Sequence, residues 1–424
     1  MRIQSRRVVL TGIGVITPIG NGVETVTAHL REGRHGLAPV DLLGNPNIPV
    51  KLAGTIKGFE VGSASYRDWS WPSEYEIPRE TVRSLAPHGV YALCAGQQAL
   101  QNAGLAPSDV AEKTDTGLFC ASAGSAMLLH HNLAQMHAVR GERGNPMGLV
   151  SSISGTLNFN LAAFFRITGA VSGFVSACAS SSHALGYACD EIRLGRLNRV
   201  LVVGAEDVNA ESLLPFLAMR ALSSGSVPEQ ASRPFDVARD GFVGAGGAVA
   251  VVLEDEDTAL ARGASPYAEL AGWGQSADGY SVASPLPEGT GLRLAMERAL
   301  ADASESAGSV GYVNAHATST PQGDRAEAIA LQSLFGSTGV PISSTKGLTG
   351  HPLSMAGVME VALCALSMRG GFIPGNPHLA NADPVCAGLN LPRETTFSAP
   401  RVVLSNSSGF GGSNVCLVLR GLDR

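Results

Sequence analysis

Short apolar runs alternate with amphipathic stretches along most of this 424-residue chain. Apolar runs predict buried strands at residues 7–15, 116–121, 200–203, 246–253, 267–272, 310–314, 340–343, 401–405 and 414–419. Apolar residues at helical spacing predict helices at residues 82–103, 258–263, 292–303, 324–335 and 355–368. Alternation of strands and helices is typical of largely parallel sheets covered by helices, so we expect an α/β fold.

The strand–helix pattern restarts after Tyr267, which divides the chain into two parts. We predict an N-terminal half at residues 1–262 and a C-terminal half at residues 263–424. The segment 35–80 is polar and interrupted by Pro and Gly, and we interpret it as an insertion or cap on the first half. A chain of this length can hold several average domains or one large duplicated unit.

One cysteine, Cys178, stands where a predicted strand passes into a predicted helix. Residues 170–176 are rich in strand formers, and apolar residues at helical spacing continue through Leu185 and Ile192. Unpaired N–H groups and the positive end of the helix dipole meet at such a helix start, so we expect a lowered thiol pKa and a nucleophilic thiolate. Taken alone, a buried cysteine is more often structural, because free Cys packs like a small apolar residue.

Three further polar segments favour a chemical role for that cysteine. They are residues 314–324 (NAHATSTPQGD), 344–351 (STKGLTGH) and 406–414 (NSSGFGGSN). His316 and His351 each follow a predicted strand, so both imidazoles can point into one cleft. Thr318 and Thr320 alternate on an extended segment, which places their hydroxyls on one face.

In this order and spacing, the four segments resemble the β-ketoacyl-ACP synthases, the condensing enzymes of fatty-acid and polyketide synthesis. The likeness is greatest to the bacterial type I synthases, includes residues 232–236 (SRPFD) and 239–242 (RDGF), and covers essentially the whole chain. The resemblance implies a duplicated thiolase-like fold with five layers, α/β/α/β/α. It also implies decarboxylative Claisen condensation of an enzyme-bound acyl group with malonyl-ACP.

The resemblance assigns roles to residues that match the family's motifs. Cys178 is expected to accept the acyl group, and its N–H and that of Phe410 to bind the thioester oxyanion, with Phe410 also gating the acyl pocket. His316 and His351 are expected to stabilise the enolate, since such aligned donors are worth roughly 3–4 kcal/mol each. Lys346 completes the expected catalytic set, and we expect it to pair with Glu327. Substrate-binding roles fall to Thr318, Thr320, Ser408, Gly409 and Gly411, and structural support to Asp324 and Glu327.

Two positions depart from the family's pattern. Ser408 stands where the family usually has an aromatic residue, and Ala317 where it usually has glycine. Loss of a ring beside the gate enlarges or polarises the mouth of the pocket. Two interpretations therefore stay open, an ordinary acyl chain in type II fatty-acid synthesis and a specialised chain, such as a polyunsaturated one, in polyketide or polyene synthesis.

Composition excludes several other classes of function. The net charge of −6 argues against a nucleic-acid binder, and the sequence has no uninterrupted apolar run of about 18 residues that would span a membrane. Seven scattered cysteines without CxxC spacing favour reduced thiols in the cytoplasm and disfavour a zinc site. We expect no metal and no bound cofactor, because the phosphopantetheine arm arrives with the carrier.

The expected partners are an acyl carrier protein and a second ketosynthase subunit, in a homodimer or a heterodimer. Carrier proteins are acidic, and the resemblance to type I synthases points to four arginines as contacts: Arg79, Arg83, Arg140 and Arg143.

Three alternatives remain open. A catalytically silent subunit of a ketosynthase heterodimer would not be expected to keep Cys178, both histidines and Lys346. A thiolase would be expected to have a second reactive cysteine near the C-terminus, and neither Cys386 nor Cys416 has an activating motif. An initiating synthase would be expected to have Asn where His351 stands.

Overall fold

The protein is described by a computed structural model that covers residues 6–41, 45, 47–142, 144–336 and 338–422. Strands from both halves join in one eleven-stranded sheet, in the order β11-β10-β12-β13-β9-β1-β8-β7-β5-β6, with β2 paired to β1. A separate two-stranded hairpin, β3–β4, lies in the predicted cap segment. The strands are β1 (Val8–Thr17), β2 (Gly20–Asn21), β3 (Leu37–Pro39), β4 (Leu52–Gly54), β5 (Thr116–Ala121), β6 (Val171–Phe174), β7 (Arg199–Glu206), β8 (Gly247–Asp255), β9 (Ala268–Ala277), β10 (Tyr312–Asn314), β11 (Ile342–Ser343), β12 (Val402–Gly409) and β13 (Ser413–Arg420).

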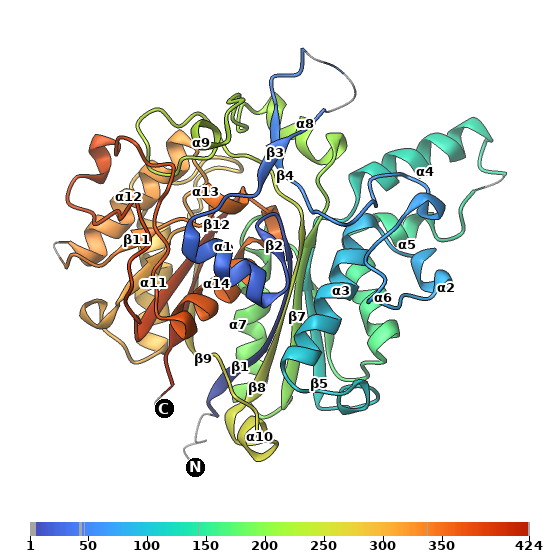
Figure 1. The fold of residues 1–424 in the computed structure, drawn as a ribbon, viewed down its shortest axis with the longest axis horizontal. Coiled ribbons are helices and arrows are strands. Elements are labelled where there is room, and N and C mark those ends of the chain that lie inside the picture. The colour runs from blue at the N-terminus through green and yellow to red at the C-terminus, as the bar shows by residue number, and fades with distance from the viewer. Residues whose placement is uncertain (1–5, 42–44, 46, 143, 337, 423–424) are drawn as a thin grey trace.

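The helices form three layers around the two halves of this sheet (Figure 1). Helices α7 and α14 lie between the halves, α3 and α6 cover the outer face of the first half, and α11 and α12 cover that of the second (Figure 1). This arrangement confirms the α/β thiolase-like class. The helices are α1 (Val23–Glu32), α2 (Arg79–Val82), α3 (Pro87–Asn102), α4 (Ala126–Ala138), α5 (Gly148–Ser152), α6 (Thr156–Phe165), α7 (Ser180–Arg193), α8 (Ala210–Ala218), α9 (Pro228–Ala231), α10 (Glu256–Ala261), α11 (Thr290–Asp302), α12 (Pro321–Phe335), α13 (Lys346–Thr349) and α14 (Ala356–Gly370).

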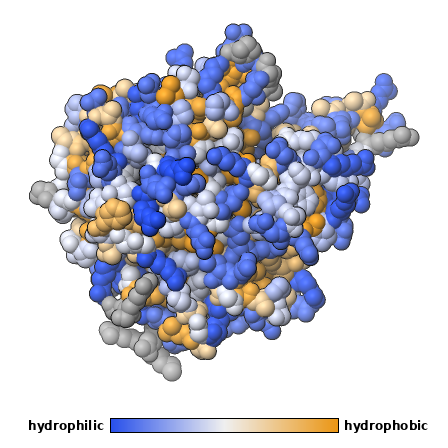
Figure 2. All heavy atoms as spheres, in the orientation of Figure 1, coloured by the Kyte–Doolittle hydropathy of each residue, from blue (hydrophilic) through white to orange (hydrophobic). Residues whose placement is uncertain are grey.

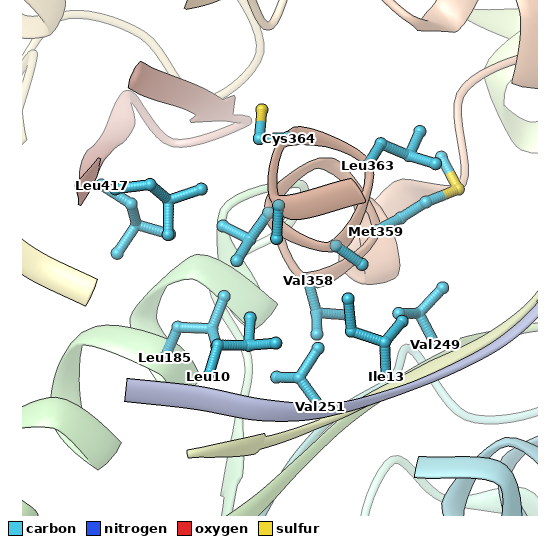
Figure 3. Packing of buried hydrophobic residues seen from close by; sticks show 14 of the residues in the cluster. Leu10, Ile13, Leu185, Val249, Val251, Val358, Met359, Leu363, Cys364 and Leu417 are labelled. Carbon is cyan, nitrogen blue, oxygen red and sulfur yellow. The ribbon is translucent and has the colours of Figure 1, made fainter. Parts of the chain in front are cut away.

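The central layer forms the largest core. Helix α14 is apolar on almost every side, as expected for a helix surrounded by protein. Figure 3 shows Val358 of α14 facing strand residues such as Ile13 and Val251, with Met359 and Leu363 on another side of the helix. The segment Leu353–Gly370 is long and apolar enough to cross a membrane by length and composition, but 89% of it is buried inside the protein. Its apolar character is therefore that of a core helix.

Two features differ from the sequence-based expectation. The sheet is mixed, because only β5 with β6 and β7, and β10 with β11 and β12, pair in parallel. Hairpin-like pairings, such as β12 with β13, supply the antiparallel part. The helix expected at 82–103 begins five residues later, at Pro87 of α3, because Pro lacks the N–H for an intrahelical bond and is favoured at a helix start; Val82 instead ends the short helix α2. The division of the chain at residues 262 and 263 stays a prediction.

The surface mixes hydrophobic and hydrophilic residues over the face seen in Figure 2. All seven cysteines are free thiols, and six of them are buried. Cys178 alone among the seven is partly accessible, which separates it from the structural thiols.

Candidate active site

Cys178 lies on a tight turn between β6 and α7, as the sequence predicted. The preceding residue, Ala177, has φ of 51°, a left-handed conformation that is uncommon for a residue with a side chain. Ser180 holds the turn, because its hydroxyl accepts a hydrogen bond from the Ser176 N–H at 2.8 Å and donates one to the Ala177 carbonyl at 2.6 Å. The thiol is therefore presented by backbone geometry, with its supports inside the same short segment.

The predicted lowering of the Cys178 pKa is wrong. Part of the residue reaches the cavity, but the surrounding protein raises the pKa of its thiol to about 12. Burial is the largest cause, Lys346 acts against it, and Glu206 adds to it. Cys178 also precedes the first helical residue, Ser180, by two positions, and the helix-dipole effect falls off steeply away from the first turn. The resting nucleophile is therefore a protonated thiol that needs a proton acceptor.

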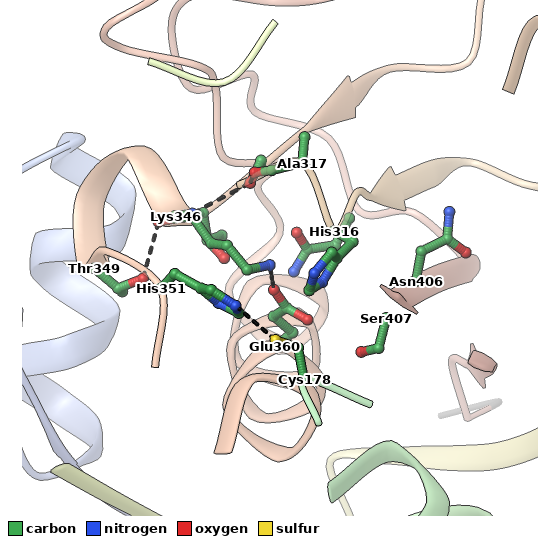
Figure 4. A network of polar contacts seen from close by, with 12 residues as sticks. Cys178, His316, Ala317, Lys346, Thr349, His351, Glu360, Asn406 and Ser407 are labelled. Atoms are coloured by element: carbon green, nitrogen blue, oxygen red, sulfur yellow. Dashed lines mark hydrogen bonds and ion pairs between the residues drawn. The ribbon is translucent and has the colours of Figure 1, made fainter. Parts of the chain in front are cut away.

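That acceptor is within reach, because the two predicted histidines converge on Cys178 (Figure 4). The Nε2 atom of His351 lies 3.0 Å from the Cys178 sulfur. The rings of His316 and His351 meet edge to face, with centroids 5.3 Å apart. Burial and the nearby Lys346 hold the pKa of each imidazole well below its usual range, so both are neutral at neutral pH.

Different elements hold the two histidines in place. The His351 N–H donates to the Val243 carbonyl at 2.7 Å, and the His351 carbonyl accepts from the Ala245 N–H at 3.0 Å. The Glu327 carboxylate accepts from the N–H groups of His316 at 2.9 Å and Ala317 at 2.6 Å. Glu327 thus supports the turn that carries His316, in agreement with its predicted structural role.

The expected pair of Lys346 with Glu327 is wrong, because Lys346 pairs with Glu360 of α14 (Figure 4). Both side chains are fully buried. The Glu327 oxygens are occupied by backbone N–H groups and by the Asn406 amide, which leaves Glu360 as the carboxylate facing the ammonium group. Burial raises the pKa of Glu360, although Lys346 lowers it. Sequence reasoning missed Glu360, which is the one charged residue in the apolar stretch 355–368 and could have been noticed there.

The threonines and Asp324 lie where the motif placed them. The hydroxyls of Thr318 and Thr320 are 3.1 Å apart, on one face as expected. The Asp324 carboxylate is fully buried and accepts from the N–H groups of Phe235 at 2.8 Å and Ser319 at 3.1 Å. It therefore joins the motif at residues 314–324 to the motif at residues 232–236.

The glycine-rich segment packs its backbone directly against the nucleophile. A Cβ atom on Gly409 would lie 2.7 Å from the Ser176 carbonyl oxygen and 3.1 Å from the Cys178 nitrogen, so the close approach requires glycine. Gly411 has φ of 82°, which also favours glycine. Between these glycines Phe410 is 38% exposed, at the place expected of a gate.

Two aromatic residues connect Phe410 to the His351 imidazole: Phe216, which sequence reasoning missed, and Phe242, which belongs to the motif at residues 239–242. Phe216 lies between Phe410, with ring centroids 6.0 Å apart, and Phe242, with centroids 5.4 Å apart. Phe242 in turn meets the His351 ring edge to face at 5.2 Å. Phe216 is on α8, a helix that sequence reasoning did not predict, so only the fold brings this aromatic column together.

A cavity of about 410 Å³ collects most of the predicted residues. Gly411, Lys346 and Asp324 are outside its lining, and Lys346 and Asp324 act from beneath it. Ser408 lines the cavity, but its hydroxyl is bonded to Asn414, so it does not present a free polar group at the mouth. The lining includes Cys178, His316, His351, Thr318, Thr320, Ser408, Gly409 and Phe410.

Metal ligation is geometrically compatible with one group among the described residues. The ligand atoms of Cys178, His316 and His351 lie within 4.8 Å of one another, and sulfur with imidazole nitrogen suits a soft metal such as zinc. These atoms are the same ones that a thioester substrate would use. The metal-free, cofactor-free reaction stays a prediction.

Three of the four arginines expected to contact the carrier are exposed, namely Arg79, Arg83 and Arg140. Arg143 lies outside the described residues.

Comparisons with known proteins agree over nearly the full chain. The family model for the N-terminal domain of β-ketoacyl synthase matches residues 5–259, and that for the C-terminal domain matches residues 267–380. The 3-oxoacyl-[acyl-carrier-protein] synthase 1 of Haemophilus influenzae is 37% identical, with 98% of this chain and 99% of the relative covered. The synthase of the same name from Escherichia coli K12 is 36% identical over the same shares.

Solved structures give the same result. A β-ketoacyl synthase from Burkholderia phymatum superimposes with a TM-score of 0.90 at 31% identity, covering 99% of this chain and all of the other. The ishigamide ketosynthase/chain length factor superimposes with a TM-score of 0.88 at 29% identity and the same coverage. The predicted resemblance is confirmed, and the chain belongs to the β-ketoacyl synthase family.

Proposed function

We propose that this protein catalyses decarboxylative Claisen condensation of an acyl group, held on Cys178, with malonyl-ACP to give β-ketoacyl-ACP. The observation that carries the proposal is the convergence of one accessible thiol and two neutral imidazoles in a single cavity, with the Cys178 sulfur 3.0 Å from His351 Nε2. The relatives named as 3-oxoacyl-[acyl-carrier-protein] synthases support it.

In the loading step, the Cys178 sulfur attacks the carbonyl of the acyl thioester. His351 Nε2 accepts the thiol proton as the new C–S bond forms. The old C–S bond breaks, and the departing pantetheine sulfur takes that proton back. One thioester replaces another, so the exchange has little thermodynamic cost. The N–H groups of Cys178 and Phe410 are proposed as donors to the oxyanion.

In the condensation step, the bond between the malonyl carboxylate and its methylene carbon breaks, and CO2 leaves. The electron pair passes into an enolate, whose oxygen we place against the N–H of His316 and the Nε2–H tautomer of His351. That nitrogen is free to carry a proton in this step, because Cys178 is already acylated and no longer donates to it. Neutral imidazoles with depressed pKa values suit this role, because they donate hydrogen bonds without titrating near neutral pH. The carbanion then attacks the acyl carbonyl, and Cys178 leaves as the thiolate, which takes a proton from water to restore the resting thiol.

The partners follow from the same proposal. The carrier's pantetheine arm would enter along the Thr318 and Thr320 face, with the carrier itself near the exposed arginines. A related structure shows a type II PKS acyl-carrier protein in complex with its ketosynthase, at a TM-score of 0.87 and 28% identity.

A second ketosynthase subunit is the other proposed partner. Strand β6 ends the described sheet, and Val171 (40%) and Val175 (74%) at this edge are exposed. An uncovered edge of apolar residues favours pairing with another chain. The structural similarity to a ketosynthase/chain length factor supports a heterodimer as well as a homodimer. Because this chain keeps the thiol, both imidazoles and the buried lysine, we assign it the catalytic place in either assembly. Its cytoplasmic location stays a prediction.

The experiment that tests the proposal is intact-protein mass spectrometry after incubation with acyl-ACPs of varied chain. The wild-type protein is expected to gain the mass of one acyl group, and the chain that adds most readily defines the substrate. Cys178→Ser is expected to lose both the adduct and condensation. An adduct that persists in that variant, on one of the six buried cysteines, would contradict the assignment.

A further inference from the structure

The departure at Ser408 has a specific hydrogen-bonding partner. Ser408 on β12 lies directly opposite Asn414 on β13, next to the turn that carries Phe410. The Ser408 hydroxyl donates to Asn414 Oδ1 at 2.8 Å. Asn414 Nδ2 donates to Asp278 Oδ1 at 2.7 Å and to the Gly412 carbonyl at 3.1 Å.

This chain of bonds continues into the segment that faces the gate. The Asp278 N–H donates to the Gly412 carbonyl at 2.8 Å, and Asp278 Oδ2 accepts from the Leu286 N–H at 2.9 Å. The Gly411 N–H donates to the Val282 carbonyl at 2.9 Å. The residues around Phe410 are therefore fixed to residues 278–286, and both segments contribute to the lining of the cavity.

We call the hydrogen bonds that join Ser408, Asn414 and Asp278 the clamp. Ser408 sets the orientation of the Asn414 amide in it, because an asparagine amide has a donor end and an acceptor end. Asn414 is only 3% exposed, and its Oδ1 accepts the hydrogen bond that the Ser408 hydroxyl donates. With Oδ1 engaged, Nδ2 points to Asp278. Without the hydroxyl, a buried acceptor is left unpaired and the amide is free to rotate away from Asp278.

The clamp acts on Phe410, which lines the cavity together with Cys178. Phe410 lies between the clamped glycines and contacts Phe216, whose aromatic column ends on His351. We therefore expect a change at the clamp to alter how often Phe410 leaves Phe216 and widens the way to Cys178.

We propose that Ser408 is a positioning residue, which holds the Phe410 gate closed in the resting protein through Asn414 and Asp278. Within the proposed condensation reaction, the clamp sets how readily acyl chains reach Cys178. The gate itself is a property of the fold and does not require that the reaction be assigned correctly.

The test is the rate of Cys178 alkylation by iodoacetamide at fixed pH, followed by intact and peptide mass spectrometry. Loss of one buried hydrogen bond predicts about a fivefold faster alkylation of Cys178 in Ser408→Ala. Ser408→Thr keeps the hydroxyl and is expected to return the rate to within about twofold of wild type. Asp278→Asn, which weakens the far end of the clamp, is expected to accelerate alkylation in the same direction.

The six buried cysteines provide an internal control, since their alkylation reports unfolding and is expected to stay slow in every variant. An unchanged rate in both Ser408→Ala and Asp278→Asn, or equal acceleration by Ser408→Ala and Ser408→Thr, would overturn the proposal. The assay contains no acyl substrate. Alkylation can therefore be faster in Ser408→Ala even if the wild-type protein takes no acyl group. That result would contradict the proposed function and support the gate inference.

Discussion

The two sides of the catalytic cavity are built by different physical means. On the side from the first half, Cys178 is presented by a strained backbone turn whose hydrogen bonds stay within residues 176–180. On the side from the second half, the Val243 and Ala245 backbone, distant in the sequence, holds His351, and the buried Glu327 carboxylate holds His316. The nucleophile is set by local geometry, and the enolate donors by buried polar networks.

Because of this difference, we expect mutations on the two sides to have different effects. A thiol on a self-contained turn can be replaced with little effect on the surrounding fold. The histidine side depends on groups such as Lys346 and Glu360, which do not line the cavity. They influence it through the imidazoles and through the packing of α14. Mutations there are expected to act on stability as well as on chemistry.

The largest expected effect is on that buried pair. Glu360→Gln leaves the Lys346 ammonium group buried without its partner, and is expected to lower the free energy of unfolding by about 3–5 kcal/mol. The matched control is Glu297→Gln on α11, which breaks an exposed i,i+4 pair with Arg293 and is expected to cost less than about 0.5 kcal/mol. Denaturant titration of both variants measures the difference, and equal losses would contradict a special role for the buried pair.

The second prediction concerns the protonation state on the cysteine side. Because burial raises the pKa of the Cys178 thiol to about 12, the thiolate fraction is expected to rise about tenfold per pH unit from pH 6 to 9. The rate of Cys178 alkylation should follow it without a plateau. A plateau beginning below pH 7 would mean that the helix start does lower the pKa and that Cys178 rests as a thiolate.

The smallest effect is expected at the gate. Ser408→Phe removes the hydroxyl that pairs with Asn414 and places a ring beside Phe410. We expect the ring to narrow acceptance of long or rigid unsaturated chains severalfold relative to short saturated chains. Competition between short saturated and longer polyenoyl-ACPs on both proteins measures the preference ratio. An unchanged ratio would assign specificity to residues deeper in the protein.

Much of the fold was predictable because the buried strands are apolar enough to be read from the sequence. The strand expected at residues 116–121 matches β5, Thr116–Ala121, and those of the second half fall on β9 to β13. The antiparallel pairings were not predicted, because strand direction depends on which strands become neighbours. Helices α4, α5 and α6 were missed, since their apolar residues do not follow a clear helical period.

The site was predicted as a set of residues and only partly as a set of contacts. Motif spacing placed Cys178, His316 and His351 at strand ends that the fold brings together. The predicted ion pair of Lys346 with Glu327 was wrong, because the Glu327 carboxylate accepts hydrogen bonds from backbone N–H groups. Such backbone contacts leave no signal in the sequence. The pKa of Cys178 was also wrong, since a local helix-start argument omits the protein packed around the sulfur.

The most direct test of the division between the two sides is a crossed measurement on Cys178→Ala and His316→Ala. Acyl loading is followed by the mass of the adduct, and malonyl-ACP decarboxylation by release of CO2. Cys178→Ala is expected to lose the adduct and keep decarboxylation. His316→Ala is expected to keep the adduct and lose decarboxylation by about a hundredfold or more. His351→Ala should impair both, because its Nε2 lies 3.0 Å from the thiol. Loss of both activities in Cys178→Ala and in His316→Ala alike would contradict the account.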